Sequence, residues 1–210
     1  LSGKLTACLQ GGGGTQLLAS YSAERHPVVA TNRDDFILKS IIEDREFTEA
    51  YNPEKDLKAF ENAWAQRAAG DDSMVTQYLP HYAGSPIVCG QPEARSGATG
   101  KHGFVAQAGH HLSPLPLSGD DELWDHLGAG FTLMNLTGDT ILTEAFSSAA
   151  AARGAPLKTL DLAKTGLSDS YKAEAILVRP DHFIAWTGSH ADADAARILY
   201  HAIGKFGDDQ

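Results

Sequence analysis

The sequence YKAEAILVRPDHFIAWTG, residues Tyr171–Gly188, predicts two β-strands joined by one tight turn. Proline 180 fixes φ at about −65° for the second position of a type I turn, and aspartate suits the third, so the turn covers residues 179–182. The run Ala175–Val178 is entirely apolar, which is typical of a strand buried on both faces. Residues 183–187 alternate between two faces, as a second strand does. We therefore expect this hairpin inside a sheet.

The residues before and after the hairpin predict a βαβ unit and a final helix. The expected elements are a helix at 121–127, a strand at 131–136, a helix at 142–152 that ends at Gly154, a strand at 157–162, an irregular piece with an optional helix, the hairpin, and a helix at 191–206. Two strands joined through a helix imply a parallel crossover, and the hairpin adds antiparallel strands. The predicted fold class is α/β, a thioredoxin-like mixed sheet with helices on both faces.

The N-terminal third of the chain is predicted to be helical. Residues 1–10 end a helix at the run Gly11–Gly14, and Thr15 is the expected N-cap of a helix over 16–25. Pro27 is expected to kink or restart that helix. The apolar spacing then predicts an amphipathic helix within 28–47 and a third helix at 56–69.

Residues 70–117 are rich in glycine and proline and show little periodicity beyond a short strand at 75–78. A connection of this length is typical of a linker, a binding loop or a segment wrapped over another surface. The predicted organisation is therefore a helical segment at 1–70, an extended connection at 71–117 and the thioredoxin-like domain at 118–210.

Composition excludes several classes of protein. The chain has 17 Lys and Arg against 27 Asp and Glu, a formal charge of −10, which argues against a nucleic-acid partner. Cys8 and Cys89 are far apart and form no C-x-x-C pair, so we expect a reduced, cytoplasmic setting. No membrane-spanning segment or signal peptide is apparent. The chain begins without Met in what looks like the middle of a helix, which suggests a fragment of a longer protein.

Several apparent motifs fail on inspection. The run Gly11–Gly14 follows a helix and lacks the third glycine of a dinucleotide fingerprint, and Gly97–Lys101 is flanked by Arg95 and His102 where a P-loop needs Gly and Ser or Thr. No nucleophile elbow occurs. Ser189–Asp192 is interpreted as the cap of the last helix.

Histidines and carboxylates in the connecting region do not predict a metal site. His102, His110-His111 and Asp120-Asp121 lack metal-ligand spacing. Where a thioredoxin-like domain would carry its dithiol, Thr137–Ile141 contains no cysteine, so disulfide exchange is not expected. The sequence therefore predicts no catalytic, cofactor-binding or metal-ligating residue in this chain. Arg179 at the hairpin turn is expected to be solvated or paired structurally.

Two stretches resemble the FAD-dependent aromatic hydroxylases of the phenol hydroxylase and polyketide hydroxylase type. The first matches the segment that closes the flavin domain, through Lys4-Leu5, Leu9, Gly11, Leu17-Leu18, Ser20-Tyr21, Glu24-Arg25 and Pro27-Val28. The second matches the cysteine-free thioredoxin-like domain, through Gly130–Leu133, Ala151–Leu157, Leu160-Asp161, Leu177–Asp181 and Ala185-Trp186. Gly109–Leu117 matches the loop that leads into that domain poorly, and Gly3 stands where the family usually has Trp.

The resemblance implies the C-terminal part of a monooxygenase that uses FAD, NAD(P)H and O2 to hydroxylate a phenolic or polyketide ring. The FAD site would precede Leu1, so no cofactor and no activity are expected in this chain alone. Its implied partners are the N-terminal flavin domain, an aromatic substrate held by the parent protein, and a second copy in a homodimer. The resemblance also implies exposed apolar surface on residues 1–64. Glu24 and Arg25 are either a buried ion pair or exposed helix charges.

One alternative from another class remains open. It is a stand-alone thioredoxin-like interaction module without redox activity, whose helical N-terminal half binds a partner. A redox-active thioredoxin is a third reading, and the missing C-x-x-C argues against it.

Overall fold

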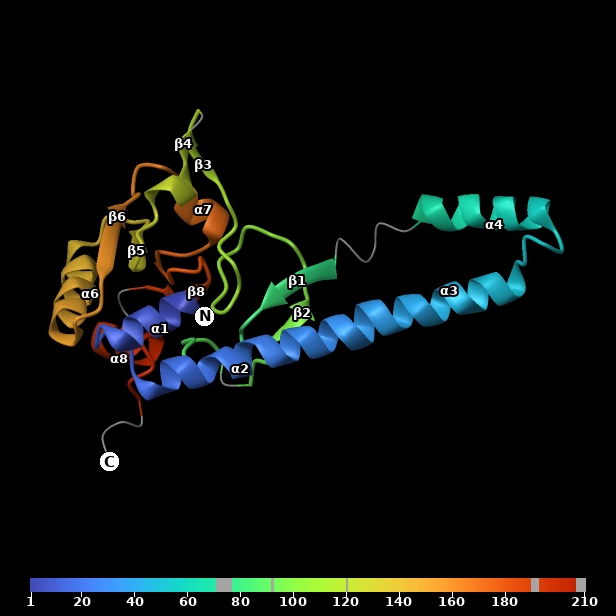
Figure 1. The fold of residues 1–210 in the computed structure, drawn as a ribbon. Helices are drawn as coiled ribbons and strands as arrows, with labels where there is room; N and C mark the ends of the chain where they lie inside the picture. The colour runs from blue at the N-terminus through green and yellow to red at the C-terminus, as the bar shows by residue number, and fades with distance from the viewer. Residues whose placement is uncertain (71–76, 92, 120, 190–192, 207–210) are drawn as a thin grey trace. The chain divides into compact units, whose positions relative to one another are not determined.

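The computed structural model of the chain describes residues 1–70, 77–91, 93–119, 121–189 and 193–206 (Figure 1). The chain forms two compact units. Unit 1 contains Leu1–Arg25, His81–Ser96 and Gly103–Gln210, and unit 2 contains His26–Pro80 and Gly97–His102. The domain boundaries expected from the sequence stay predictions. Among the described residues, no helix combines the length and the apolar character that a bilayer span requires.

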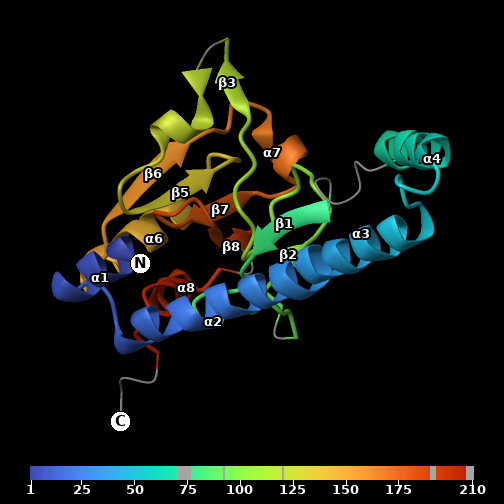
Figure 2. The ribbon, with the colours of Figure 1, turned by 45° about the vertical axis from the view of Figure 1, so that its right-hand side comes forward.

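Unit 1 is built on a four-stranded mixed sheet in the order β6-β5-β7-β8 (Figure 2). Its strands are β5 (Phe131–Asn135), β6 (Leu157–Asp161), β7 (Ala175–Val178) and β8 (Ile184–Gly188). β5 and β6 run parallel and are joined through helix α6 (Thr140–Arg153), whereas the β5–β7 and β7–β8 pairs are antiparallel. The predicted α/β class and thioredoxin-like topology are therefore confirmed.

The β7–β8 hairpin forms around the predicted turn. The amide of His182 donates to the carbonyl of Arg179 at 3.0 Å, and the amide of Arg179 donates to the carbonyl of Phe183 at 2.8 Å. His182 takes a positive φ of 65°, and the register shifts between Leu177 and Val178. All four residues of β7 are buried, as their apolar run predicts.

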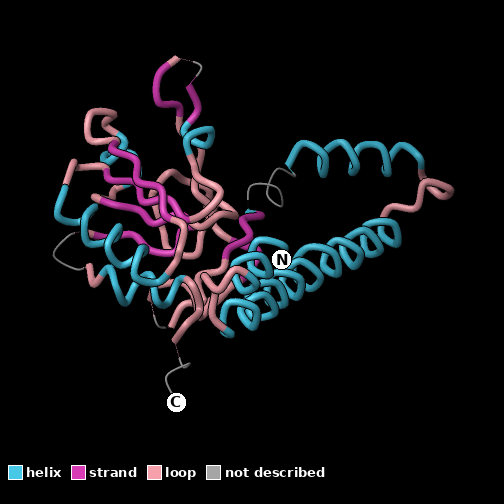
Figure 3. Tube along the Cα trace, turned by 60° about the vertical axis from the view of Figure 1, so that its left-hand side comes forward, coloured by secondary structure: helices cyan, strands magenta, loops and turns pink. Residues whose placement is uncertain are grey.

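Each face of the sheet carries its own hydrophobic core, with helical turns on either side of the strands (Figure 3). On one face, α6 and α8 (Ala195–Ala202) pack with alternate sheet residues, including Phe146, Leu177 and Leu199. On the other face, α7 (Leu167–Tyr171) and the 3-10 helix η2 (Leu123–His126) pack over the opposite set of sheet residues. Alternation along each strand thus fills both cores.

Two predicted helices differ from those observed. The short helix expected at 121–127 is confirmed only in part, as the 3-10 helix η2 (Leu123–His126), because β4 (Asp121–Glu122) pairs with β3 (Pro116–Ser118). The last helix ends at Ala202 and not at residue 206, because Gly204 adopts a φ of 70° that stops it. Its start is capped by Asp194, whose Oδ1 accepts from the amide of Arg197 at 3.0 Å. Of the Ser189–Asp192 cap, residues 190–192 lie outside the described residues.

Those parts of the extended connection that belong to unit 1 wrap over the sheet. The amide of Cys89 donates to the carbonyl of Ala185 at 2.8 Å, and the amide of Leu112 donates to the carbonyl of His182 at 2.8 Å. Ile87 and Leu112 are buried. Of the three readings of a long connection, the wrapped segment is the one observed here. Of the strand expected at 75–78, only Tyr78 lies in an observed strand, β1 (Tyr78–His81), which pairs with β2 (Gly97–Thr99). Residues 71–76 lie outside the described residues.

The N-terminal third is helical, as predicted. Its elements are α1 (Ser2–Leu9), α2 (Thr15–Thr31), the π-helical η1 (Asn32–Leu38), α3 (Lys39–Ala50) and α4 (Leu57–Gly70). Pro27 does not restart the helix, because α2 continues through it to Thr31. The hydroxyl of Thr31 donates to the carbonyl of Pro27 at 2.9 Å and gives that turn an additional hydrogen bond.

The predicted apolar exposure of residues 1–64 is confirmed. Side chains of this segment that are exposed include Leu1, Leu5, Leu9, Leu18, Tyr21, Val29, Ile37, Leu38, Ile41, Ile42, Tyr51, Leu57 and Trp64. A concentration of exposed apolar residues on helices marks a surface for another structure to cover.

Candidate functional site

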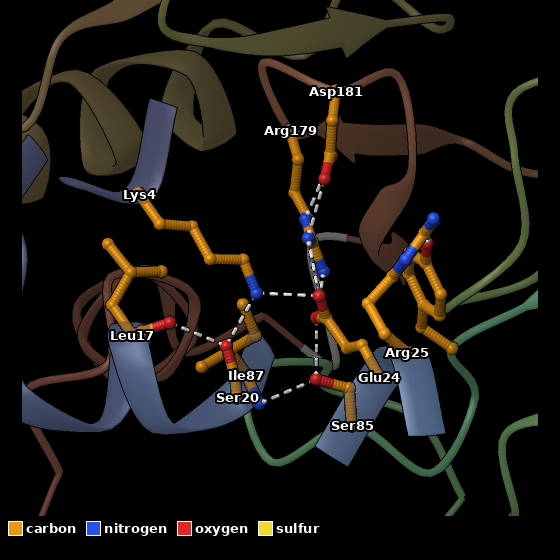
Figure 4. A network of polar contacts seen from close by, with 10 residues as sticks. Lys4, Leu17, Ser20, Glu24, Arg25, Ser85, Ile87, Arg179 and Asp181 are labelled. Atoms are coloured by element: carbon orange, nitrogen blue, oxygen red, sulfur yellow. Dashed lines mark hydrogen bonds and ion pairs between the residues drawn. The ribbon is translucent and has the colours of Figure 1, made fainter. Parts of the chain in front are cut away.

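Arg179 leaves the end of β7 and points into unit 1, where it is only 4% exposed. Its guanidinium is held by two carboxylates (Figure 4). Nη1 and Nη2 donate to Glu24 Oε1 and Oε2 at 2.6 and 3.2 Å, and Nε and Nη2 donate to Asp181 Oδ1 and Oδ2 at 3.0 and 2.7 Å. The planar fork of arginine suits this double bidentate contact, which lysine cannot reproduce.

Glu24 lies on α2 and is only 2% exposed, yet both of its oxygens are fully used. Oε1 accepts from Ser85 Oγ at 2.8 Å as well as from Arg179, and Oε2 accepts from Lys4 Nζ at 2.6 Å as well as from Arg179. A buried carboxylate is tolerated only when it is paired and hydrogen-bonded in this way.

Lys4 connects α1 to the same network. Its ammonium also donates to Ser20 Oγ at 2.6 Å, and the Ser20 hydroxyl donates to the carbonyl of Leu17 at 2.7 Å. Together, α1, α2, the segment that carries Ser85 and the β7–β8 hairpin meet at one buried carboxylate. We call Lys4, Ser20, Glu24, Ser85, Arg179 and Asp181 the buried polar network.

Burial and charge compete at each member of this network. Burial raises the pKa of Glu24, but the hydrogen bonds and charges of Arg179 and Lys4 outweigh it, so the pKa lies below its usual range. Burial is also the largest influence on Lys4 and lowers its pKa, with the Glu24 hydrogen bond acting against it. The pKa of Arg179 is raised because Asp181 and Glu24 together outweigh its burial. The Glu24 carboxylate and the Arg179 guanidinium are therefore charged at neutral pH.

An aromatic pair borders the guanidinium. Tyr82 and Phe183 stack with ring centroids 4.2 Å apart, and the Arg179 guanidinium carbon lies 5.8 and 5.9 Å from their centroids. Arg25 contributes from α2 by donating through Nη1 to the Tyr82 hydroxyl at 3.0 Å. The rings exclude water from one side of the network and strengthen its charge interactions.

The sequence indicated two of these residues but paired one of them wrongly. Glu24 is buried in an ion pair, yet its partners are Arg179 and Lys4 and not Arg25, because neighbouring residues of a helix point in different directions. Arg179 is paired and not solvated. The roles of Ser20 and Ser85 were missed, because their contacts depend on a fold that brings distant segments together.

The buried polar network joins segments that are far apart in the sequence. A cavity of about 100 Å³ beside Lys4 and Arg179 is too small for a cofactor of flavin size. The charged groups of Lys4, Glu24 and Arg179 each contact at least two partners, whereas the side chain of Asp181 is 47% exposed.

At the loop where a thioredoxin carries its dithiol, this chain has an asparagine side chain that binds the backbone. Asn135 Oδ1 accepts from the amides of Thr137, Gly138 and Asp139 at 3.3, 2.8 and 3.1 Å, and Asn135 Nδ2 donates to Thr143 Oγ1 at 2.9 Å. The loop before α6 is thus fixed by a buried amide, and it carries no thiol. Thiol exchange has no chemical basis at this loop.

The glycine run does not fit a phosphate or a flavin. The amide of Gly14 donates to the carbonyl of Ile203 at 2.8 Å, and the amide of Gln16 donates to the carbonyl of Gly204 at 3.1 Å. A Cβ at Gly14 would lie 2.2 Å from the Gly204 oxygen. These glycines allow the backbone to pack closely against Ile203 and Gly204, the residues that follow α8.

The histidines singled out in the sequence contact different neighbours. His110 stacks on His81 at 4.6 Å, and His111 packs edge-on against Trp124 at 5.2 Å. Within the described part of the chain, no group of three or more His, Cys, Asp or Glu side chains is placed to hold a metal ion. Asp120 lies outside the described residues, and Asp121 pairs with His126 at 2.7 Å.

The thioredoxin-like sheet lies in the part of the chain that matches a known protein family. A family model described as aromatic-ring hydroxylase, C-terminal, matches residues 106–206. This match covers the sheet, both of its cores and Arg179. Asp181 also lies within it, whereas the other four residues of the buried polar network, Lys4, Ser20, Glu24 and Ser85, precede it.

Two curated relatives extend the aromatic-ring hydroxylase match over nearly the whole chain. Aklavinone 12-hydroxylase RdmE of Streptomyces purpurascens is 30% identical over 213 residues, which cover 95% of this chain and 36% of the relative. Tetracenomycin A2 monooxygenase-dioxygenase of Streptomyces glaucescens is 25% identical over 229 residues, which cover 97% of this chain and 36% of the relative. The chain therefore spans little more than a third of the length of these relatives.

Solved structures give the same result. The rebeccamycin biosynthetic enzyme RebC with reduced flavin is 28% identical, with a TM-score of 0.71 over 96% of this chain and 39% of that one. The flavin-dependent monooxygenase PieE, in complex with FAD and substrate, is 22% identical with a TM-score of 0.73 over 96% of this chain and 42% of that one, and it supports the fold alone. The chain matches the C-terminal portion of FAD-dependent aromatic hydroxylases.

Proposed function

We propose that this chain is the C-terminal portion of an FAD-dependent monooxygenase that hydroxylates a phenolic or polyketide aromatic ring with NAD(P)H and O2. The observation that carries the proposal is the Glu24–Arg179 ion pair, because it joins the two stretches that resemble the family into one buried contact. FAD supplies the oxygen chemistry in such enzymes, and the protein positions it. In this proposal the flavin-binding residues belong to the part of the parent that this chain does not include.

The role of this chain within the parent is structural. The buried polar network fixes the thioredoxin-like sheet to α1 and α2, the helices that resemble the end of the flavin domain. On these two helices, Leu5, Leu9, Leu18 and Tyr21 are 42%, 87%, 38% and 37% exposed. Their exposed surface is apolar and is proposed to pack against the flavin domain of the same protein.

The finer parts of the proposal follow the resemblance. The described glycine run and the network cavity do not fit FAD, so the chain alone is proposed to bind no flavin and to be inactive. A reduced, cytoplasmic setting suits the two free cysteines. A homodimer formed by the parent protein is a further part of the proposal.

Activity of the full-length parent tests the proposal directly. The purified parent should bind FAD, oxidise NADH or NADPH faster when an aromatic substrate is present, and yield a product heavier by one oxygen atom. Steady-state kinetics and product mass spectrometry measure these effects. A parent protein without flavin, or one whose NAD(P)H oxidation ignores every phenolic and polyketide substrate, would overturn it.

A further inference from the structure

A second cavity in unit 1 lies away from the buried polar network. It has a volume of about 660 Å³ and is bounded by the segment after His81, the loop around His110 and one residue of β8. This volume is within the range of small-molecule sites, roughly 300–1,000 Å³. Its polar lining includes His81, Gln91, Arg95, Gln107 and His110, and we call it the His81–His110 cavity.

The walls of this cavity are fixed by backbone contacts. The amide of Tyr82 donates to the carbonyl of Gly109 at 2.7 Å, the amide of Gly109 donates to the carbonyl of Ile184 at 2.7 Å, and the amide of Ile184 donates to the carbonyl of His110 at 2.9 Å. Gly109 has a φ of 85°, and a Cβ there would lie 2.4 Å from the Cα of Ala83. The cavity is therefore pre-formed by strand-like pairing against the sheet, which favours binding.

Arg95 provides an uncommitted positive charge at this cavity. Most other arginines of the chain contact an acid, a hydroxyl or an aromatic ring: Arg25, Arg33, Arg45, Arg67, Arg153 and Arg179. Within the described residues, Arg95 lines the cavity and has no ion pair or side-chain hydrogen bond. In a chain of formal charge −10, an arginine left unpaired at a cavity is suited to an anion.

A second cation reinforces the positive field. The charge of Arg197 on α8 acts on the Cys89 sulfur, which also lines the cavity. Burial raises the pKa of this thiol and Arg197 acts against that shift, so the thiol stays protonated and does not cancel the positive charge. Gln91 and Gln107 add side-chain amides that can donate to the same ligand.

The histidine pair supplies a flat wall. The rings of His81 and His110 lie parallel, with centroids 4.6 Å apart and planes 5° apart. Burial and the neighbouring His81 lower the pKa of His110 to about 4, so this ring is neutral at physiological pH. A bound anion would stabilise the protonated ring, so occupancy of the cavity and the charge of His110 are linked.

We propose that the His81–His110 cavity binds a small organic anion whose phosphate or carboxylate head pairs with Arg95. A planar carboxylate and a tetrahedral phosphate both present two oxygens that can accept hydrogen bonds from the arginine guanidinium. The volume exceeds that of a bare oxyanion and leaves room for an organic body along the histidine wall. The proposal stands independently of the hydroxylase function.

Titration calorimetry on the 210-residue chain at fixed ionic strength tests this site, with phenyl phosphate, benzoate and inorganic phosphate as probes. At least one of the two organic probes should bind at a single saturable site. Arg95→Gln should weaken that binding about tenfold or more, because a hydrogen-bonded charge pair is lost. Arg45→Gln, at an exposed helix position of the other unit, should leave the affinity unchanged. A preference between phenyl phosphate and benzoate identifies the head group.

A second readout separates this site from nonspecific attraction. The pKa of His110, followed by NMR of its ring protons, should start near 4 and rise when the tighter probe is added. The proposal is overturned if neither organic probe saturates at millimolar concentrations, even where inorganic phosphate binds. It is also overturned if Arg95→Gln binds as tightly as the unmodified chain, or if the pKa of His110 does not respond to the bound probe.

Discussion

Arg179 and Glu24 are 155 residues apart in sequence and form a buried bidentate ion pair, with Nη1–Oε1 and Nη2–Oε2 distances of 2.6 and 3.2 Å. One partner ends a strand of the thioredoxin-like sheet, and the other lies on a helix near the start of the chain. Because both side chains are almost fully buried, neither charge has water to replace its partner. The pair therefore makes folding of the sheet and docking of α2 depend on each other.

Removing the charge of Glu24 should strongly destabilise unit 1. Glu24→Gln removes the carboxylate that Arg179 and Lys4 share and leaves only the partly exposed Asp181 to pair with Arg179, so the free energy of unfolding should fall by about 3–5 kcal/mol. Glu49→Gln is the matched control, because Glu49 pairs with Arg45 on an exposed helix surface, and it should change stability by less than about 0.5 kcal/mol. Urea denaturation measures both. Equal losses of stability in the two variants would show that the buried ion pair contributes no more to folding than the exposed one.

The same carboxylate should give the protein an acid-dependent stability. The pKa of Glu24 is lower in the folded state than the value of about 4.3 expected in the unfolded chain. Its contribution is therefore complete above about pH 5 and is lost as the pH falls through the folded-state value. The stability difference between the unmodified chain and Glu24→Gln should shrink as the pH is lowered from neutrality. A difference that stays constant with pH would contradict this assignment.

Replacing the guanidinium with an ammonium should show how much the fork geometry contributes. In Arg179→Lys the charge remains, but lysine cannot place two parallel donors on Glu24 and two more donor contacts on Asp181. We expect a loss of about 1–3 kcal/mol in the free energy of unfolding, less than for Glu24→Gln. Chemical denaturation of both variants shows which one loses more stability. A larger loss of stability in Arg179→Lys than in Glu24→Gln would mean that the geometry of the contacts matters more than the charge.

The contact between the glycine run and the end of α8 should tolerate no side chain. Gly14→Ala places a Cβ 2.2 Å from the backbone oxygen of Gly204. The free energy of unfolding should fall by about 3 kcal/mol, because the group that the Cβ meets is backbone and cannot rotate away. Gly3→Ala is the control, because its Cβ meets nothing within 4 Å inside helix α1, and it should stabilise by about 0.5–1 kcal/mol. Thermal unfolding of the two variants should therefore shift in opposite directions.

The sequence was most informative where a structure depends on neighbouring residues. The Arg179–His182 turn, the apolar β7 run and the C-cap at Gly154 all follow from local backbone preferences and were predicted. The helix expected at 121–127 begins only at Leu123, because pairing of β4 with β3 overrides local propensity at Asp121 and Glu122.

The candidate site was only partly predictable for the same reason. Arg179 and Glu24 stand out as charged residues within apolar or helical contexts, but nothing local to either one names the other as its partner. Pairing Glu24 with its sequence neighbour Arg25 was the natural guess, and the fold instead brings Arg179 and Lys4 to it. Ser85 and the His81–His110 cavity arise from a connection that showed no periodicity, so only its path over the sheet reveals them.

The central claim is that this chain supplies the scaffold of a flavin monooxygenase while the flavin is bound elsewhere in the parent. Titrating FAD into the purified 210-residue chain, with the visible flavin spectrum recorded after removal of free cofactor, tests it most directly. The account predicts no saturable binding and a colourless protein, whereas the full-length parent treated in the same way should be yellow. Stoichiometric FAD retained by the 210-residue chain would contradict it.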